Sequence, residues 1–188
     1  MNETIEDIAR SISCCRLCRL SDTRINPVCG EGNIKTRIMF IGEAPGENED
    51  KTGKPFAGKA GYFLTELIEL AGLKREDVFI ANILKCRPPK NRNPLPDEIE
   101  FCTQFLRKQI EIVKPSVICA LGNFAMKYFM GEKYSISKLH GRFFNKNGCI
   151  VFPSYHPAAS IYNPVLKNEM KNDFLKLKRF IKVRLFEG

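Results

Sequence analysis

The sequence predicts an α/β fold, a three-layer αβα sandwich around a central, mainly parallel four-stranded sheet. The first observation is a set of apolar runs that are too short for helices and suit buried strands; they occupy residues 37–42, 78–84, 116–121 and 149–152. The second is that helix-like segments separate most of these runs, which favours parallel pairing with right-handed crossovers. The third is that glycine- and proline-rich loops follow the strands.

The crossover helices each have a local signal. Residues 3–20 combine an amphipathic helix with a group of cysteines, and the segments that separate the strands are residues 59–70, 96–113 and 123–130. A proline at the first position of the second of these segments, followed by acidic residues in its first turn, marks a helix start.

The last third of the chain predicts a hairpin and a closing helix. Residues 145–148 form a turn signal between strands at 142–144 and 149–152. A loop over residues 153–164 then leads to a long basic helix over residues 165–184. We interpret its lysines and arginines mainly as a solvated face, with phosphate contacts as the alternative.

Composition limits the class of protein. With 188 residues and 44% hydrophobic content, the chain suits one domain with a full core, and we expect a single domain over residues 1–188. A net charge of +9 and a pI near 9.2 favour a polyanionic partner such as nucleic acid. The chain shows neither an apolar run of about eighteen residues nor a secretory leader, so we expect a cytoplasmic protein with reduced thiols and no membrane partner.

Four of the eight cysteines form the best metal-ligand set. The two-residue gap between Cys15 and Cys18 lets both thiolates reach one metal, and Cys86 and Cys102 are candidates for the remaining ligands. Spacing alone does not distinguish zinc from an iron–sulfur cluster, because both accept four thiolates. The other cysteines are Cys14 and Cys29, which are weaker alternates, and Cys119 and Cys149, which we expect to be small hydrophobes in buried strands.

The loop after the first strand is where we expect the active site. Two glycines and a proline between Gly42 and Gly46 allow backbone amides to approach a ligand closely. Ligands of open α/β sheets bind at the carboxyl ends of the strands. Three further loops, containing Phe56, Asn82 and His156, would gather at the same edge.

Five short motifs follow one another along these loops. They are Gly42-Glu-Ala-Pro-Gly46, Gly53-x-Pro-Phe56-x-Gly58-x-Ala-Gly61, Asn82-x-x-Lys-Cys86-Arg-Pro-Pro-x-Asn91-Arg, Ala120-Leu-Gly122 and His156-Pro-Ala158. Over nearly the whole length, the chain resembles the family 4 uracil-DNA glycosylases, the iron–sulfur type of bacteria and archaea. The resemblance implies a base-excision-repair hydrolase that flips uracil out of DNA, hydrolyses its N-glycosidic bond and leaves an abasic site. It also implies one 4Fe-4S cluster per chain on Cys15, Cys18, Cys86 and Cys102.

The resemblance also implies roles for individual residues. A flipped pyrimidine would stack on Phe56, and the Asn82 amide would match the O4 acceptor and N3–H donor of uracil and mismatch cytosine. His156 would donate to O2 as negative charge develops on the leaving base. Backbone amides of the first loop would add contacts to the base, so the expected uracil-binding residues also include Gly42, Glu43 and Ala44. We expect His140, which lies outside the motifs, to be structural or at the surface.

The group that orients the attacking water is left open by the sequence. Family 1 relatives have an aspartate where this chain has Ala44, so Glu43, Glu47 and Asp50 are the candidates. Because the departing sugar is cation-like, weak orientation of water by a carboxylate or a backbone carbonyl would suffice. An alternative role for Glu47 is to crowd the C5 position of the base and exclude thymine.

DNA contacts are expected at Ile161 and Tyr162, which would wedge between bases, and at Arg92. Relatives often have leucines and an arginine in the wedge loop, so strand affinity is expected to differ. The expected partner is uracil-containing DNA, single- or double-stranded, bound by a monomer, with a replication sliding clamp as a candidate protein partner. The alternatives are a non-catalytic iron–sulfur or zinc nucleic-acid-binding module and a redox protein, and we rank both below the glycosylase.

Overall fold

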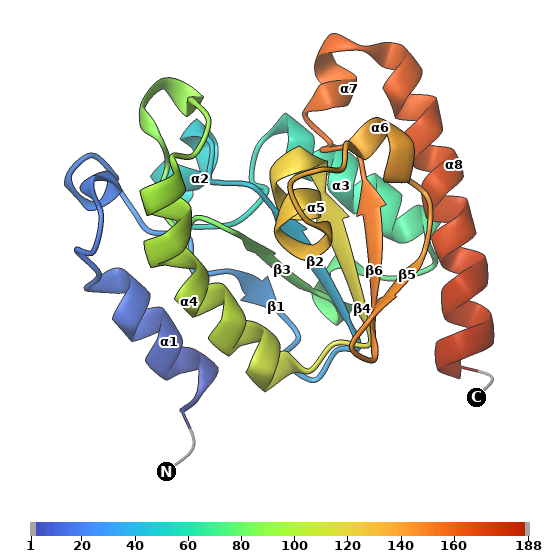
Figure 1. The fold of residues 1–188 in the computed structure, drawn as a ribbon, viewed down its shortest axis with the longest axis horizontal. Helices are drawn as coiled ribbons and strands as arrows, with labels where there is room; N and C mark the ends of the chain where they lie inside the picture. The colour runs from blue at the N-terminus through green and yellow to red at the C-terminus, as the bar shows by residue number, and fades with distance from the viewer. Residues whose placement is uncertain (1–2, 187–188) are drawn as a thin grey trace.

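The computed structural model describes residues 3–186 and shows one sheet with helices on both faces (Figure 1). The strands lie in the order β1-β3-β2-β4-β6-β5. The four central strands are parallel, and β1 and β5 pair antiparallel at the two edges. The predicted four-stranded parallel sheet is therefore the centre of a six-stranded sheet. The strands are β1 (Glu31–Gly32), β2 (Ile38–Gly42), β3 (Phe79–Asn82), β4 (Val117–Leu121), β5 (Phe144–Lys146) and β6 (Cys149–Ser154).

The helices form the two outer layers of the predicted sandwich. In Figure 1, α4 and α5 cover one face of the sheet with α1 beside them, and α3 and α8 cover the other. The long helices are α1 (Ile5–Ser13), α3 (Lys59–Leu70), α4 (Pro96–Val113), α5 (Gly122–Met130) and α8 (Pro164–Ile181). The short ones are α2 (Glu47–Thr52), α6 (Ile136–Leu139) and α7 (Ala159–Tyr162), with the 3₁₀ turns η1 (Arg19–Asp22), η2 (Arg75–Asp77) and η3 (Pro89–Asn91) and the π-helical turn η4 (Lys182–Phe186). No helix within residues 3–186 has the length and apolar character needed to cross a membrane.

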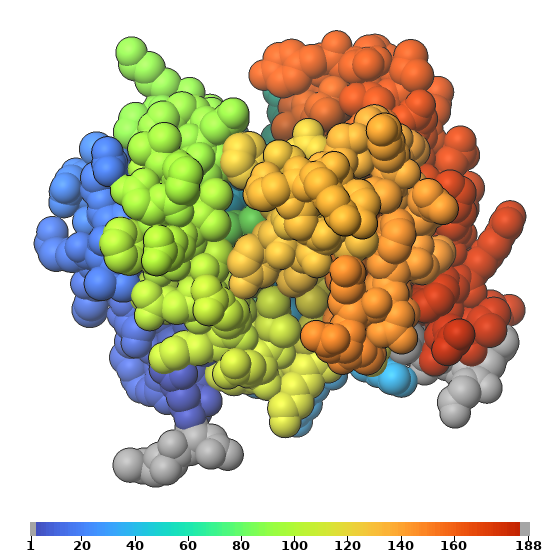
Figure 2. Space-filling view, in the orientation of Figure 1, coloured from blue at the N-terminus to red at the C-terminus, as the bar shows by residue number. Residues whose placement is uncertain are grey.

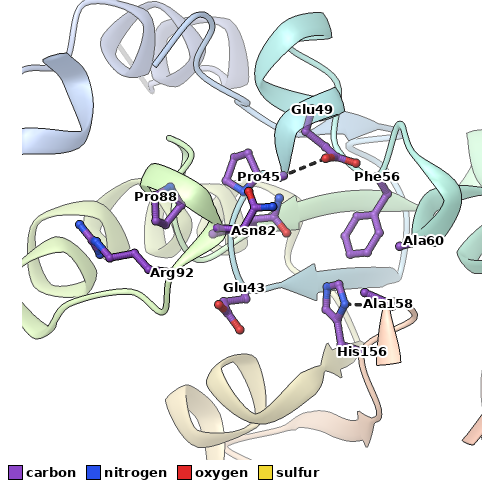
Figure 3. A pocket seen from close by; sticks show the side chains of 13 residues that line it. Glu43, Pro45, Glu49, Phe56, Ala60, Asn82, Pro88, Arg92, His156 and Ala158 are labelled. Carbon is purple, nitrogen blue, oxygen red and sulfur yellow. Dashed lines mark hydrogen bonds between the residues drawn. The ribbon is translucent and has the colours of Figure 1, made fainter. Parts of the chain in front are cut away.

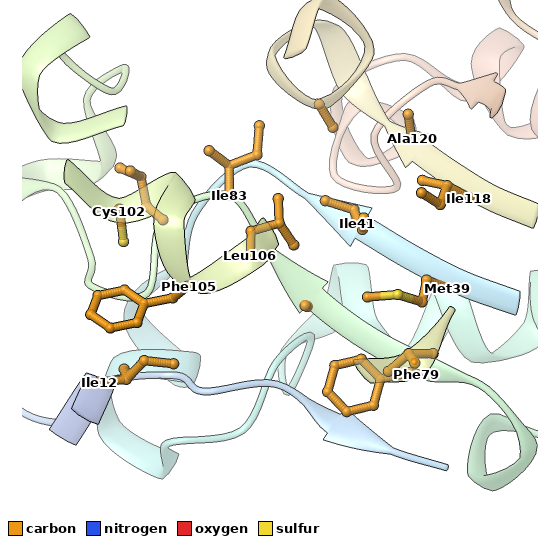
Figure 4. Close-up of a cluster of buried hydrophobic side chains, with 14 of the residues drawn as sticks. Ile12, Met39, Ile41, Phe79, Ile83, Cys102, Phe105, Leu106, Ile118 and Ala120 are labelled. Atoms are coloured by element: carbon orange, nitrogen blue, oxygen red, sulfur yellow. The ribbon is translucent and has the colours of Figure 1, made fainter. Parts of the chain in front are cut away.

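Alternate residues of the central strand supply the two halves of the core. Met39 and Ile41 pack with α1 and α4 in the cluster drawn in Figure 4, whereas Ile38 and Phe40 pack against α3 and α8. All five residues of β2 are buried, as expected for a parallel strand covered on both faces. This double burial explains why the strand is a continuous apolar run in the sequence.

Two element boundaries differ from the sequence-based prediction. Helix α1 ends at Ser13, so the first cysteines lie in the turn that follows it. In the hairpin, β5 spans Phe144–Lys146 and not residues 142–144, which leaves a turn of only two residues. Those residues, Asn147 and Gly148, have φ values of 51° and 87°, the positive φ values that a two-residue type I′ turn requires.

The crossover connections change side at β2, which is the topological switch point of the sheet. The chain passes from β2 to β3 on one side through α3, and then crosses back to β4 on the other side through α4. Ligands of doubly wound sheets bind outside the carboxyl ends of the strands at such a switch. In the space-filling view, the segment just before α4 and the region around α7 stand apart at this edge with a gap between them (Figure 2).

Candidate active site

A cavity of about 280 Å³ opens at the carboxyl edge of the sheet. Its walls come from the loops that follow β2, β3 and β6 and from the segment before α3, so the loops predicted to gather there do so. In Figure 3, Pro88 and Arg92 lie at one end, Phe56 and His156 at the other, and Asn82 between them. The lining residues are Glu43, Ala44, Pro45, Gly46, Glu49, Phe56, Ala60, Asn82, Pro88, Asn91, Arg92, His156 and Ala158.

Asn82 is the last residue of β3 and is held at the cavity with an unused hydrogen-bonding group. The residue is 2% exposed, and its Oδ1 has no hydrogen-bond partner in the described part of the chain. A buried polar atom without a partner is costly, and ligand sites are where such atoms are found. The strand pair places Gly42 directly beside Asn82. A Cβ at Gly42 would lie 2.4 Å from Asn82 Oδ1 and 2.8 Å from the Phe56 ring, so only glycine leaves space for both side chains.

Phe56 and His156 form one aromatic wall. Their ring centroids are 5.5 Å apart at an interplanar angle of 26°. Phe56 has a φ of 52°, an uncommon conformation for a bulky residue, and such strain occurs most often at functional sites. A Cβ at Gly61 would lie 1.7 Å from the Phe56 carbonyl oxygen, so the glycine at the start of α3 is what permits this backbone path.

His156 is held as a neutral donor. Its Nδ1 accepts a hydrogen bond from the backbone N–H of Ala158 at 3.2 Å, which leaves the ring proton on Nε2. Burial lowers the pKa of His156 to about 4, and the nearby Glu49 carboxylate opposes that shift. At neutral pH the ring therefore offers one N–H without carrying a positive charge.

Glu49 joins two walls of the cavity, and the sequence-based prediction did not include it. Its Oε2 accepts from the N–H of Gly46 at 3.0 Å, and its Oε1 accepts from Ala57 at 2.8 Å and from Gly58 at 3.2 Å. One carboxylate thus links the loop after β2 with the loop that contains Phe56. The signal available in the sequence was an acidic residue three positions after Gly46, the spacing at which a helix N3 side chain binds the backbone of the N-cap residue.

The three carboxylates predicted as water-orienting candidates lie in different environments. Glu43 lines the cavity, and burial raises its pKa. Glu47 lies outside the cavity lining, where it is exposed and paired with Lys51 at 2.6 Å, and that hydrogen bond lowers its pKa. Asp50 is buried away from the cavity, and its Oδ1 accepts from the N–H of Ile25 at 2.9 Å.

Comparison with known proteins agrees with this geometry. The profile of the "Uracil DNA glycosylase superfamily" matches residues 29–178. The chain belongs to this superfamily. It is 49% identical over 185 residues to a type-4 uracil-DNA glycosylase of Saccharolobus solfataricus, covering 94% of this chain and 86% of that one. It is 47% identical to the type-4 enzyme of Thermotoga maritima, with 96% of each chain covered, and 34% identical to a type-5 enzyme of Pyrobaculum aerophilum, with 70% and 66% covered.

The residues expected to contact DNA lie in two places. Arg92 is part of the cavity lining, and Ile161 and Tyr162 are exposed on α7. Arg92 lines the cavity and forms hydrogen bonds of 2.9 and 2.5 Å to the two carboxylate oxygens of Glu98, which is fully buried. The ion pair lowers the pKa of Glu98 and fixes the Arg92 side chain against α4. Ile161 and Tyr162 lie in α7, where they are 50% and 88% exposed.

The four predicted cysteine ligands surround a small cavity between α1 and α4. Cys15, Cys18, Cys86 and Cys102 line it together with apolar side chains that include Phe101 and Phe105. Within residues 3–186, no three His, Cys, Asp or Glu side chains are gathered closely enough to hold a single metal ion. Cys102 Sγ accepts from the backbone N–H of Lys85 at 3.2 Å, and Cys86 Sγ accepts from the guanidinium of Arg24 at 3.1 Å. Apolar packing and N–H donors to sulfur are both suited to a group carried by thiolates.

The remaining cysteines, Cys14, Cys29, Cys119 and Cys149, and the second histidine are not among the residues that line either cavity. Cys119 is fully buried in β4, and Cys149 is half-buried at the start of β6, so both are strand residues as predicted. His140 is not among the residues that line the cavity. Its Nδ1 lies 2.6 Å from Oδ2 of the buried Asp173 in α8, which is a structural pairing between a loop and a helix.

Proposed function

We propose that this protein is a uracil-DNA glycosylase that removes uracil from DNA in base excision repair. The observation that carries the proposal is the buried Asn82 amide beside the cavity, whose Oδ1 has no hydrogen-bond partner among the residues that the structure describes. Relatives covering nearly all of the chain are named type-4 uracil-DNA glycosylases. The net charge of +9 suits a nucleic-acid substrate.

Recognition of the base is assigned to Asn82 and Phe56. The Asn82 Oδ1 accepts from N3–H of uracil and its Nδ2 donates to O4, a pattern that cytosine does not offer because its N3 has no hydrogen and its C4 bears an amino group. Phe56 supplies the face on which the flipped base stacks, an interaction of about 1–3 kcal/mol. The backbone amides of Glu43 and Ala44 complete the contacts.

Bond cleavage is assigned to His156 and Glu43. Negative charge develops on the base as the glycosidic bond breaks, and the Nε2–H of His156 stabilises it at O2. A neutral donor suits this role. Its hydrogen bond to O2 strengthens as negative charge develops on the base, so it stabilises the transition state more than the ground state. Glu43 is the candidate carboxylate that orients water toward the cation-like sugar, since Glu47 and Asp50 do not reach the cavity lining.

DNA is expected to lie over the α7 side of the cavity. Ile161 and Tyr162 expose apolar surface that fits a gap opened between base pairs, and Arg92 is held in place for a phosphate. A monomer and a sliding-clamp partner remain predictions.

We infer that the four cysteines hold the 4Fe-4S cluster implied by the resemblance to the family 4 enzymes. They line one cavity between segments distant in the sequence, and four thiolates are the usual ligands of such a cluster. The cluster would supply a crosslink between the turn after α1, the loop after β3 and α4. Metal-coupled ordering of this kind stabilises a fold by many kcal/mol, and we assign the cluster a structural role.

The function is tested with oligonucleotides that contain a single uracil, thymine or cytosine, followed by alkaline cleavage at abasic sites. The proposal predicts cleavage of the uracil strand alone, with no added metal or nucleotide. Absence of abasic sites over a wide range of enzyme and salt concentrations would refute it.

A further inference from the structure

A buried lysine lies between the candidate active site and the cysteine-lined cavity, and the roles assigned so far leave it unexplained. Lys85 is 1% exposed and directly precedes Cys86. Its Nζ donates to the backbone carbonyl of Asn82 at 2.7 Å and to Oε1 of Gln109 at 2.7 Å. Both acceptors are neutral oxygens.

Burial removes the hydration of the Lys85 ammonium, which is unfavourable for stability. Lys85 also lines the cysteine cavity, where Cys86 and Cys102 would offset part of that cost as thiolates. Buried charged groups that lie beside a functional cavity often have a role in it. The position of the Lys85 hydrogen bonds indicates which role that is.

The Lys85 ammonium fixes the peptide group from which the Asn82 side chain extends. After Asn82, two more backbone bonds join this segment to the end of β2, from the N–H of Ile83 to the carbonyl of Gly42 and from the N–H of Leu84 to the carbonyl of Glu43, both at 3.0 Å. The Asn82 carbonyl is held by Lys85. The Asn82 Oδ1 has no protein partner in the described part of the chain, so the direction of the side chain depends on its backbone.

Two further contacts hold Lys85 itself in place. Gln109, on α4 and 1% exposed, accepts from Lys85 and donates through Nε2 to the carbonyl of Cys29. The backbone N–H of Lys85 donates to Sγ of Cys102 at 3.2 Å. The residue that fixes Asn82 is thus anchored to α4 at two points seven residues apart, one of which is a proposed cluster ligand.

We propose that Lys85 is a positioning residue for uracil recognition, acting through the Asn82 peptide to direct the Asn82 amide into the cavity. This inference rests on the proposed function. It predicts that the effect of removing Lys85 on the reaction disappears when the Asn82 side chain is already absent.

The test is a double-mutant cycle of Lys85→Met and Asn82→Ala. The single-turnover rate on uracil-containing DNA and the affinity for an uncleavable uracil analogue in DNA are both measured, together with iron content and thermal midpoint. With Asn82 present, Lys85→Met should lower the rate by about 10- to 100-fold, the scale expected for a misplaced contact group. In the Asn82→Ala background, it should change the rate and the analogue affinity by less than about 2-fold. Equal losses in both backgrounds would show a general structural role and overturn the proposal.

Gln109→Leu provides the second variant and decides alone if Lys85→Met does not fold. It keeps the bond between Lys85 and Asn82 and removes the Gln109 anchor, together with the bond from Gln109 to the Cys29 carbonyl. We therefore expect a smaller loss of about 3- to 10-fold that also disappears in the Asn82→Ala background. An unchanged rate, or the same loss in both backgrounds, would overturn the proposal. Wild-type protein that releases no uracil would refute the proposed function, whereas active wild-type protein with additive variants would refute only the role of Lys85.

Discussion

The Glu49 carboxylate should be essential for the shape of the cavity, although it is not proposed to take part in the chemistry. In Glu49→Ala, the amides of Gly46, Ala57 and Gly58 lose their acceptor. A hydrogen bond to a charged group contributes about 1.5–3 kcal/mol, but these amides are only partly buried and water would replace part of each bond. With about 1 kcal/mol for each bond, the predicted loss of stability is about 3 kcal/mol, or about 6–12 °C in thermal midpoint for a chain of this size.

The same change should reduce activity more than it reduces DNA binding. Without Glu49, the loop after β2 and the loop that contains Phe56 are no longer linked, so the stacking face and the backbone donors lose their relative position. A misplacement of this kind costs about 10²-fold in rate. Single-turnover kinetics and a thermal melt on the same sample measure both effects, with Glu66→Ala, an exposed carboxylate on α3, as the control that should change neither. A Glu49→Ala protein with wild-type midpoint and rate would refute the role given to this carboxylate.

Three further predictions follow from the environments of single residues. Burial raises the pKa of Glu43, whose protonation would also lower the rate in acid, so the profile is measured on Glu43→Gln. Because burial lowers the pKa of His156 to about 4 and the neutral ring is the proposed donor, the single-turnover rate of that variant should stay level from pH 8 to about 5 and fall near pH 4. A loss of rate centred near pH 6.5 would contradict this role for His156. The same pKa shift means that the folding stability contributed by the neutral His156 ring is complete above about pH 6.5 and is lost as pH falls toward 4. Glu47→Gln should keep the wild-type rate and discrimination against thymine, because its exposed side chain faces Lys51; measurable thymine release would instead place it at the base. Cys86→Ala should lose most of its iron and melt at a lower temperature than wild-type protein, and normal iron content by metal analysis would remove Cys86 from the ligand set.

The central sheet could be predicted from the sequence because burial determines its pattern. Strand β2 is covered on both faces, so it had to be a continuous apolar run, and the glycines after it indicated a loop that approaches a ligand closely. The edge strand β1 has only two residues, of which one is Gly32 with a φ of 119°, so no periodic pattern existed to reveal it. The hairpin was predicted, but its strand boundary was two residues off, since the turn depends on which asparagine takes a positive φ.

The site could be predicted only where a side chain faces the cavity directly. Asn82, Phe56 and His156 stand in short motifs because their side chains face the cavity. Glu49 was not predicted because α2 has no apolar face to mark it as a helix, and its carboxylate acts on backbone amides from two loops whose proximity appears only after folding. The Lys85 contacts with Asn82 and α4 depend in the same way on tertiary packing.

Excision by Asn82→Asp on matched uracil and cytosine oligonucleotides tests whether Asn82 recognises uracil in this cavity. Asn82 is buried at the cavity, and the functional proposal rests on its Oδ1, which has no hydrogen-bond partner within residues 3–186. An aspartate lacks the Nδ2 donor, so the account predicts loss of uracil release, by about 10²-fold or more, from protein that keeps its iron content and thermal midpoint. Cytosine release by this variant would strengthen the account, because a carboxyl group can pair with the cytosine edge. Uracil release at the wild-type rate by folded Asn82→Asp would contradict the claim that this cavity recognises uracil.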